Sequence, residues 1–169
     1  MLRPAITASF TVALLTGWTF YDARSKPETQ TGPLVGAWSV VQVTRDSAGT
    51  RRTTRQPGLY LFTQRHYSIT RVDSSRPRPD FPGQARRTAH TYEEIWGPFS
   101  ANAGVYEIQG RRIWTRPQVA KNPSTMVADN FVVYEWRTKG DTLWMKTIAN
   151  ADGVVSPGTL VKLVRAERP

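Results

Sequence analysis

The sequence has no cysteine among its 169 residues. Disulfides, thiolate metal ligands, a cysteine nucleophile and lipid attachment at cysteine are therefore excluded. Histidine is also scarce, with only His66 and His90, and no His, Asp or Glu falls at a metal-binding spacing such as His-x-x-x-His. Phosphate-loop, dinucleotide and Gly-x-Ser-x-Gly motifs are missing too. We expect no metal site and no cofactor.

The sequence also lacks an apolar run long enough to span a bilayer comfortably. Near its N-terminus, Arg3 precedes the apolar run Ala5–Leu15, which is typical of a secretory signal, although no small-x-small cleavage pair stands out. We expect residues 1–24 to be a signal peptide or an uncleaved tether, and residues 25–33 a flexible linker. The expected location is the periplasm or the exterior, with no integral membrane part beyond the N-terminal segment.

Acidic residues are few, 13 against 23 Lys and Arg, which gives a net charge of +10. Removing residues 1–24 leaves +9, because that segment contains Arg3 and Arg24 against Asp22. Much of the excess is arginine in two clusters: Arg51, Arg52 and Arg55, then Arg71, Arg76, Arg78, Arg86 and Arg87. Such charge favours either an anionic partner or simply a solvated basic surface. With a secretion signal in front, nucleic acid is not an expected partner.

Hydrophobic residues make up 39% of the chain, with six each of Trp, Tyr and Phe, enough for one core in one domain over residues 34–165. Short runs rich in Val, Ile, Tyr, Trp and Thr alternate with turn residues, which is typical of sandwiches and barrels. We predict eight strands, over 34–44, 58–63, 66–72, 103–108, 111–119, 131–138, 142–148 and 159–165. Short sequential connections favour an all-β, eight-stranded antiparallel up-and-down barrel over an open sandwich, because closure removes exposed edges.

The long connection between the third and fourth predicted strands contains one expected helix. Residues 73–87 include three prolines and predict an irregular loop. The segment Thr91–Trp96 follows, where Thr91 and Glu94 match a capping box and a Gly-Pro pair ends the helix. We expect this short helix to lie over a barrel end.

A Gly-x-Trp signature, Gly36-Ala37-Trp38, lies near the start of the first predicted strand. The segments that accompany it are Leu34-Val35, Gly58-Leu59-Tyr60, His66-Tyr67-Ser68, Ala103-Gly104-Val105-Tyr106 and Gly140-Asp141-Thr142-Leu143. Together they resemble the bacterial lipocalin-like domain family, a calycin-type β-barrel, across residues 34–164.

The resemblance implies structural roles for three residues. In that family the tryptophan, here Trp38, packs across the closed base of the barrel against a basic side chain of the last strand, Lys162 or Arg165 in this sequence. Gly36 allows a neighbouring chain to approach closely. The resemblance also implies an internal cavity, but it does not fix a ligand.

Aromatic side chains are spread over several predicted strands. Within a barrel, residues of one parity face inward, so about half of these rings should line the interior. They either fill a solid core or wall a pocket for a flat or greasy molecule, with an arginine to fix an acidic group. The candidate ligand-lining residues are Tyr60, Phe62, His66, Tyr106, Trp114, Tyr134 and Trp136.

Three functions follow from these patterns. The first is an exported protein that binds a small hydrophobic or amphipathic ligand inside the barrel. The second is an isomerase or cyclase in the same cavity, with His66, Glu107 or Glu135 turned inward as a buried acid or base; no catalytic residue is assigned. The third is a module without a pocket, whose basic loops dock on anionic envelope components or on a partner protein.

Overall fold

The computed structural model describes residues 32–47, 50–80, 83 and 88–167. The expected signal segment, residues 1–24, lies outside the described residues, as do most of the expected linker and part of the proline-containing loop. Within the described ranges, no helix has both the length and the apolar character needed to cross a membrane.

The described elements are mostly strands. In chain order they are β1 (Gly36–Ser47), β2 (Thr50–Thr54), β3 (Gly58–Phe62), β4 (His66–Val72), the helix α1 (Ala89–Trp96), β5 (Phe99–Gln109), β6 (Arg112–Ala120), the 3₁₀ helix η2 (Pro123–Met126), β7 (Val132–Lys139), β8 (Thr142–Asn150), β9 (Gly153–Val154) and β10 (Leu160–Glu167).

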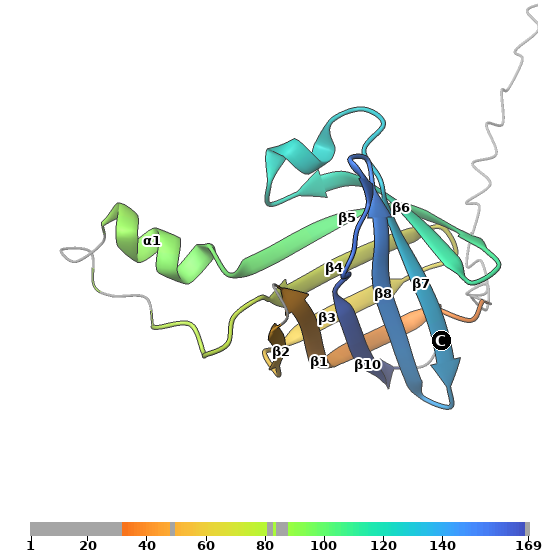
Figure 1. Cartoon of the computed structure of the whole chain (residues 1–169), viewed down its shortest axis with the longest axis horizontal. Helices are drawn as coiled ribbons and strands as arrows, with labels where there is room; N and C mark the ends of the chain where they lie inside the picture. The colour runs from red at the N-terminus through yellow and green to blue at the C-terminus, as the bar shows by residue number, and fades with distance from the viewer. Residues whose placement is uncertain (1–31, 48–49, 81–82, 84–87, 168–169) are drawn as a thin grey trace, which may run out of the picture.

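The strands close into a barrel (Figure 1). The sheet order is β10-β1-β3-β4-β5-β6-β7-β8, every neighbouring pair is antiparallel, and β8 pairs with β10 to complete the ring. The eight strands of this ring are those predicted from the sequence, in the predicted order. The eight-stranded up-and-down barrel is therefore confirmed.

Two short strands outside the ring were not predicted. β9 adds a brief pairing to β8, and β2 pairs with the end of β1, which runs to Ser47 instead of ending at Thr44. The β2 sequence, Thr-Arg-Arg-Thr-Thr, has no apolar alternation because its side chains are exposed or half-buried. The β1–β2 hairpin thus extends past the point where β1 leaves β10, whose pairing ends at Thr44 and Leu160.

The helix α1 begins earlier than predicted. Its N-cap is Thr88, whose Oγ1 accepts a hydrogen bond from the Thr91 N–H at 3.2 Å, while the Thr91 hydroxyl accepts from the Thr88 N–H at 3.4 Å. Thr91 is therefore the third helical residue and not the cap, and Glu94 takes no part in the capping box. Only Ile95 of this helix is buried. We expected the helix to lie over a barrel end, but it projects away from the barrel in Figure 1.

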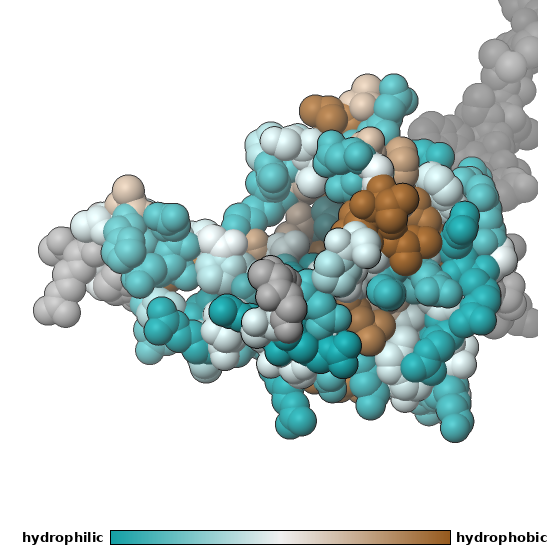
Figure 2. All heavy atoms as spheres, in the orientation of Figure 1, coloured by the Kyte–Doolittle hydropathy of each residue, from teal (hydrophilic) through white to brown (hydrophobic). Residues whose placement is uncertain are grey.

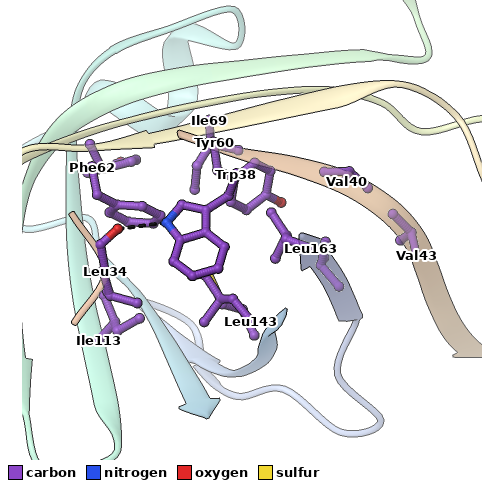
Figure 3. Close-up of a cluster of buried hydrophobic side chains, with 13 residues drawn as sticks. Leu34, Trp38, Val40, Val43, Tyr60, Phe62, Ile69, Ile113, Leu143 and Leu163 are labelled. Atoms are coloured by element: carbon purple, nitrogen blue, oxygen red, sulfur yellow. Dashed lines mark hydrogen bonds between the residues drawn. The ribbon is translucent and has the colours of Figure 1, made fainter. Parts of the chain in front are cut away.

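The core fills the barrel around Trp38, whose side chain is fully buried (Figure 3). The indole Nε1 donates to the Leu34 carbonyl at 2.7 Å, so the polar atom of the ring is satisfied. Burying one such large apolar side chain contributes about 1.5–3 kcal/mol. The other buried members of the cluster are Leu34, Val40, Val43, Tyr60, Phe62, Tyr67, Ile69, Ile113, Leu143, Met145, Val161 and Leu163.

Antiparallel alternation gives the barrel two distinct ends. The tight connections β3–β4, β5–β6 and β7–β8 lie at one end, which we call the base. The connections that follow β1, β4, β6 and β8 lie at the opposite end, which we call the mouth. The longer, more irregular segments are all at the mouth, where loops of this kind most often carry binding residues.

Candidate functional site at the barrel mouth

A cleft of about 730 Å³ opens at the mouth. It is lined by Val43, Arg45, Thr50, Arg52, Thr54, Asp73, Ser74, Ser75 and Arg76. These residues come from the end of β1, from β2 and from the segment after β4. Three guanidinium groups, four hydroxyls and a single carboxylate therefore face one space, which makes the cleft positively charged and rich in hydrogen-bond donors.

Asp73 holds two arginines at the floor of this cleft. Its Oδ1 lies 2.8 Å from Nη2 of Arg45 and 2.9 Å from Nε of Arg71. Arg71 in turn donates from Nη1 to the Tyr60 hydroxyl at 2.7 Å. A chain of polar contacts thus runs from the mouth to Tyr60, which is 1% exposed and belongs to the core.

Burial sets the protonation of this chain. It raises the pKa of the Tyr60 phenol, an effect that the positive charge of Arg71 opposes. Burial disfavours the charged form of Arg71, but the attraction of Tyr60 and Asp73 outweighs it and raises the pKa of Arg71 above its ordinary value. Arg71 therefore stays charged and Tyr60 stays a neutral phenol at any ordinary pH.

Two more phenols lie in the barrel interior near Thr115. Burial raises the pKa of Tyr134, and it raises the pKa of Tyr67 to about 12. Thr115 is 1% exposed and donates from its hydroxyl to the Val132 carbonyl at 3.1 Å. These phenols are neutral and suited to hydrogen bonding, not to acting as bases near neutral pH.

Several polar groups of the cleft are left without a partner. Among the residues that the structure describes, no carboxylate forms an ion pair with Arg52 or Arg76, and the buried Oγ1 of Thr54 has no hydrogen-bond partner. Guanidinium groups bind carboxylate and phosphate through paired, charge-assisted hydrogen bonds. The arrangement is therefore suited to an anionic group.

Five of the candidate ligand-lining residues belong to the packed interior. Tyr60 and Phe62 are buried in the core, and Tyr106, Tyr134 and Trp136 are half-buried against it. The Tyr106 ring meets Phe62 edge-on at 5.3 Å between centroids, and its hydroxyl donates to the Thr63 carbonyl at 2.7 Å. Side chains of these residues fill space between the strands below the mouth.

The remaining two candidates face outward. Trp114 lies between Ile113 and Thr115, which both face the core, so alternation turns its ring to the outer surface, where it packs on Phe131 at 5.1 Å. His66 precedes the inward-facing Tyr67 and is exposed. Neither side chain lines the barrel interior.

The three side chains named as candidate acids or bases in the enzyme hypothesis all face outward. His66, Glu107 and Glu135 are all exposed, because each lies at the outward parity of its strand. Glu107 pairs on the surface with Arg116 at 3.6 Å. The condition that would have favoured an enzyme, one of these three residues buried in the barrel, is therefore not met.

The residues of the Gly-x-Trp signature lie at the base. The Arg165 Cζ is 4.0 Å from the Trp38 ring centroid, whereas Lys162 lies over a different ring, Trp144, at 5.9 Å. Gly36 adopts φ +123°, a conformation that residues with a Cβ rarely enter. These contacts tie the two ends of the barrel sequence together and leave the mouth free.

The mouth residues were missed because they lie at strand ends and in a loop. Arg45 continues the inward alternation of Val43 past a register shift in β1, and Asp73 directly follows β4. The signal that pointed toward them was the arginine cluster around Arg51 and Arg52, which the sequence shows but does not place on the barrel.

No family model matches the chain, and no curated protein matches it either. Among solved structures, it is similar to a lipocalin-like protein from Bacteroides uniformis, at 15% identity and a TM-score of 0.44, over 79% of this chain and 99% of that one. The strand pairings describe the architecture by themselves: eight antiparallel strands close in sequential order, and the Gly-x-Trp signature lies at the base. The described strands therefore establish an eight-stranded, antiparallel, up-and-down β-barrel fold.

Proposed function

We propose that the protein binds a small amphipathic molecule whose anionic group occupies the mouth cleft between Arg45, Arg52 and Arg76. The observation that carries the proposal is the pair of guanidinium groups, Arg52 and Arg76, without a carboxylate partner among the described residues, in a cleft of about 730 Å³. The unpartnered Thr54 hydroxyl supplies one more donor to the same group.

The apolar part of the molecule would lie against Val43, which lines the cleft and is 2% exposed. Deeper entry is opposed by the Tyr60–Arg71–Asp73 contacts at the cleft floor and by the packed rings beneath them. The site proposed here is thus at the mouth of the barrel and not deep inside it. Small-molecule sites often occupy the mouths of β-barrels.

Export to the periplasm or the exterior is part of the same proposal. It rests on Arg3 and the apolar run Ala5–Leu15, which have the pattern of a secretory signal. A binding protein outside the cytoplasm would meet amphipathic anions from the envelope or the medium.

The test compares matched ligands by calorimetry. We expect an alkyl carboxylate or alkyl phosphate to bind more tightly than the alcohol of the same chain length. The affinity for the anion should fall as the salt concentration is raised. The double variant Arg52→Gln/Arg76→Gln should lose roughly tenfold in affinity for the anion per guanidinium, with little change for the alcohol.

The control for this test removes the same charge from the base. Arg65, in the β3–β4 connection, and Lys139, the last residue of β7, are exposed at the base, so Arg65→Gln/Lys139→Gln should keep the wild-type preference for the anion. Equal affinities for the anion and the alcohol, or a double mouth variant that binds like wild type, would reject the proposed site. Native mass spectrometry of protein purified from its source would show whether an amphipathic anion accompanies it.

A further inference from the structure

A tryptophan lies between two cations on the outer wall of the barrel. The Arg137 Cζ is 3.8 Å from the Trp144 ring centroid, and the Lys162 Nζ is 5.9 Å from it. Register explains the arrangement, because Arg137 of β7 is directly opposite Trp144 of β8, which is directly opposite Lys162 of β10. The three side chains form one row across three strands.

A second row lies beside the first. Arg112 of β6 is opposite Glu135 of β7, which is opposite Lys146 of β8. On the two strands that both rows share, β7 and β8, the rows are two residues apart. Alternation directs both rows outward, since Ile113 and Met145, next to these residues, face the core. We call this surface the basic wall; its cations are Arg112, Arg137, Lys146 and Lys162.

The basic wall carries a net positive charge. Glu135 is the single carboxylate in the two rows, and within the described part of the chain none of the four cations forms an ion pair. At the mouth, by comparison, Asp46 pairs with Arg51 and Asp73 with Arg45, and only Arg52 and Arg76 among the cleft-lining arginines lack a carboxylate partner in the described residues. Hydrophilic side chains predominate over β7 and the lower half of β8 in Figure 2.

We propose that the basic wall docks the protein on an anionic lipid bilayer, with Trp144 at the level of the headgroups and the cations around it against lipid phosphates. Tryptophan concentrates at membrane–water interfaces, and long basic side chains extend from such a surface toward phosphate. Each Lys or Arg near an anionic membrane raises the partitioning of a protein about fivefold. The unpaired cations and the central ring thus complement a negatively charged lipid surface.

This proposal does not depend on the ligand site. The basic wall is on the side of the barrel, and the mouth connections are at its end, so docking would leave the mouth cleft open. It also differs from our sequence-based hypothesis of docking through the basic loops, because the cations used here lie on strands.

The first test is co-sedimentation with lipid vesicles. We expect binding to vesicles of phosphatidylcholine mixed with phosphatidylglycerol, none to phosphatidylcholine alone, and release at high salt. The triple variant Arg137→Gln/Lys146→Gln/Lys162→Gln should bind on the order of 100-fold more weakly. The matched control Arg55→Gln/Arg65→Gln/Arg116→Gln loses the same charge at exposed positions outside both the basic wall and the mouth cleft, and should bind nearly as wild type does.

The second test locates the contact through tryptophan fluorescence. Brominated lipids quench indoles at the bilayer surface, so we expect quenching that Trp144→Phe abolishes and that Trp96→Phe, on the exposed end of α1, leaves intact. Thermal unfolding of each variant verifies that it is folded.

Three results would overturn the proposal. The first is an equal loss of vesicle affinity in the wall triple variant and the control triple variant. The second is quenching that disappears with Trp96→Phe but not with Trp144→Phe. The third is a stronger affinity for heparin or a single-stranded oligonucleotide than for phosphatidylglycerol vesicles. The last result would identify a polymeric anion as the occupant of the basic wall.

Discussion

The guanidinium of Arg165 lies over the indole of Trp38, with its Cζ 4.0 Å from the ring centroid, and it also donates to the Val35 carbonyl at 2.8 Å. The two residues are opposite each other in the pairing of β1 with β10. This contact therefore covers the buried ring at the base and links the first strand of the barrel to the last. It strengthens the pairing of β1 with β10 in the closed barrel.

We expect Arg165→Ala to lower the free energy of unfolding by about 2–4 kcal/mol, because it removes a cation–π contact and a charge-assisted hydrogen bond. The control is Lys162→Ala, whose ammonium lies 5.9 Å from a ring on the outer surface and whose loss should cost about 0.5 kcal/mol. Urea unfolding at neutral pH measures both values. Similar losses of unfolding free energy in the two variants would show that the contact of Arg165 with Trp38 stabilises the fold no more than the exposed contact does.

The polar chain at the cleft floor gives a second prediction. Tyr60→Phe keeps the buried ring but removes the hydroxyl that accepts a 2.7 Å hydrogen bond from Arg71, so it should cost about 1–3 kcal/mol of unfolding free energy. Tyr106→Phe removes an exposed hydrogen bond to Thr63 and should cost about 0.5–1 kcal/mol. A larger loss for Tyr106→Phe would contradict the importance that we assign to Arg71.

The barrel itself was predictable from local signals. Each ring strand carries either apolar alternation or an aromatic and β-branched run, and most are separated by turn residues such as Gly110 and Gly140, which adopt φ +59° and φ +55°. β2 carries no such signal, since its pairing depends on how far β1 extends beyond the end of its pairing with β10. The start of α1 was misplaced because Thr88 and Thr91 are both good capping residues, and only the backbone shows which one is the cap.

The candidate site was less predictable, for a geometric reason. Asp73, which directly follows β4, forms an ion pair with Arg45 of β1, although β3 lies between these two strands. Sequence alternation divides each strand into two faces but does not say which face is inside, and a register shift in β1 reverses the parity before Arg45. The same ambiguity placed Trp114 and His66 among the inward candidates, although both face outward.

Close strand packing gives a third prediction. A Cβ on Gly104 would lie 2.0 Å from the Arg116 carbonyl oxygen, at the bulge where β5 passes β6, so Gly104→Ala must push the two strands apart. We expect a loss of about 1–3 kcal/mol in unfolding free energy. Gly83→Ala is the control, because nothing lies within 4 Å of its added methyl, and it should change stability by less than about 0.5 kcal/mol. Differential scanning calorimetry of the two variants decides the matter.

The buried phenols make stability depend on alkaline pH. Burial raises the pKa of Tyr60, Tyr67 and Tyr134, so in the folded chain they keep their protons above pH 10, where the unfolded chain releases them. The folded state then binds more protons than the unfolded state, and the free energy of unfolding falls as pH rises. We expect it to be steady up to about pH 9 and to decline from about pH 10 toward pH 12, the pKa of Tyr67.

The variant Tyr67→Phe isolates one phenol. Each shifted group contributes up to about 1.4 kcal/mol per pH unit to the decline, so this variant should show a shallower loss of stability between pH 10 and pH 12 by about that amount. Tyr92→Phe is the control, because it removes a phenol from an exposed position on α1, and it should leave the slope unchanged. Urea unfolding at a series of alkaline pH values measures the slopes. Equal slopes for wild type and Tyr67→Phe would mean that this phenol ionises in the folded chain as readily as it does in the unfolded chain.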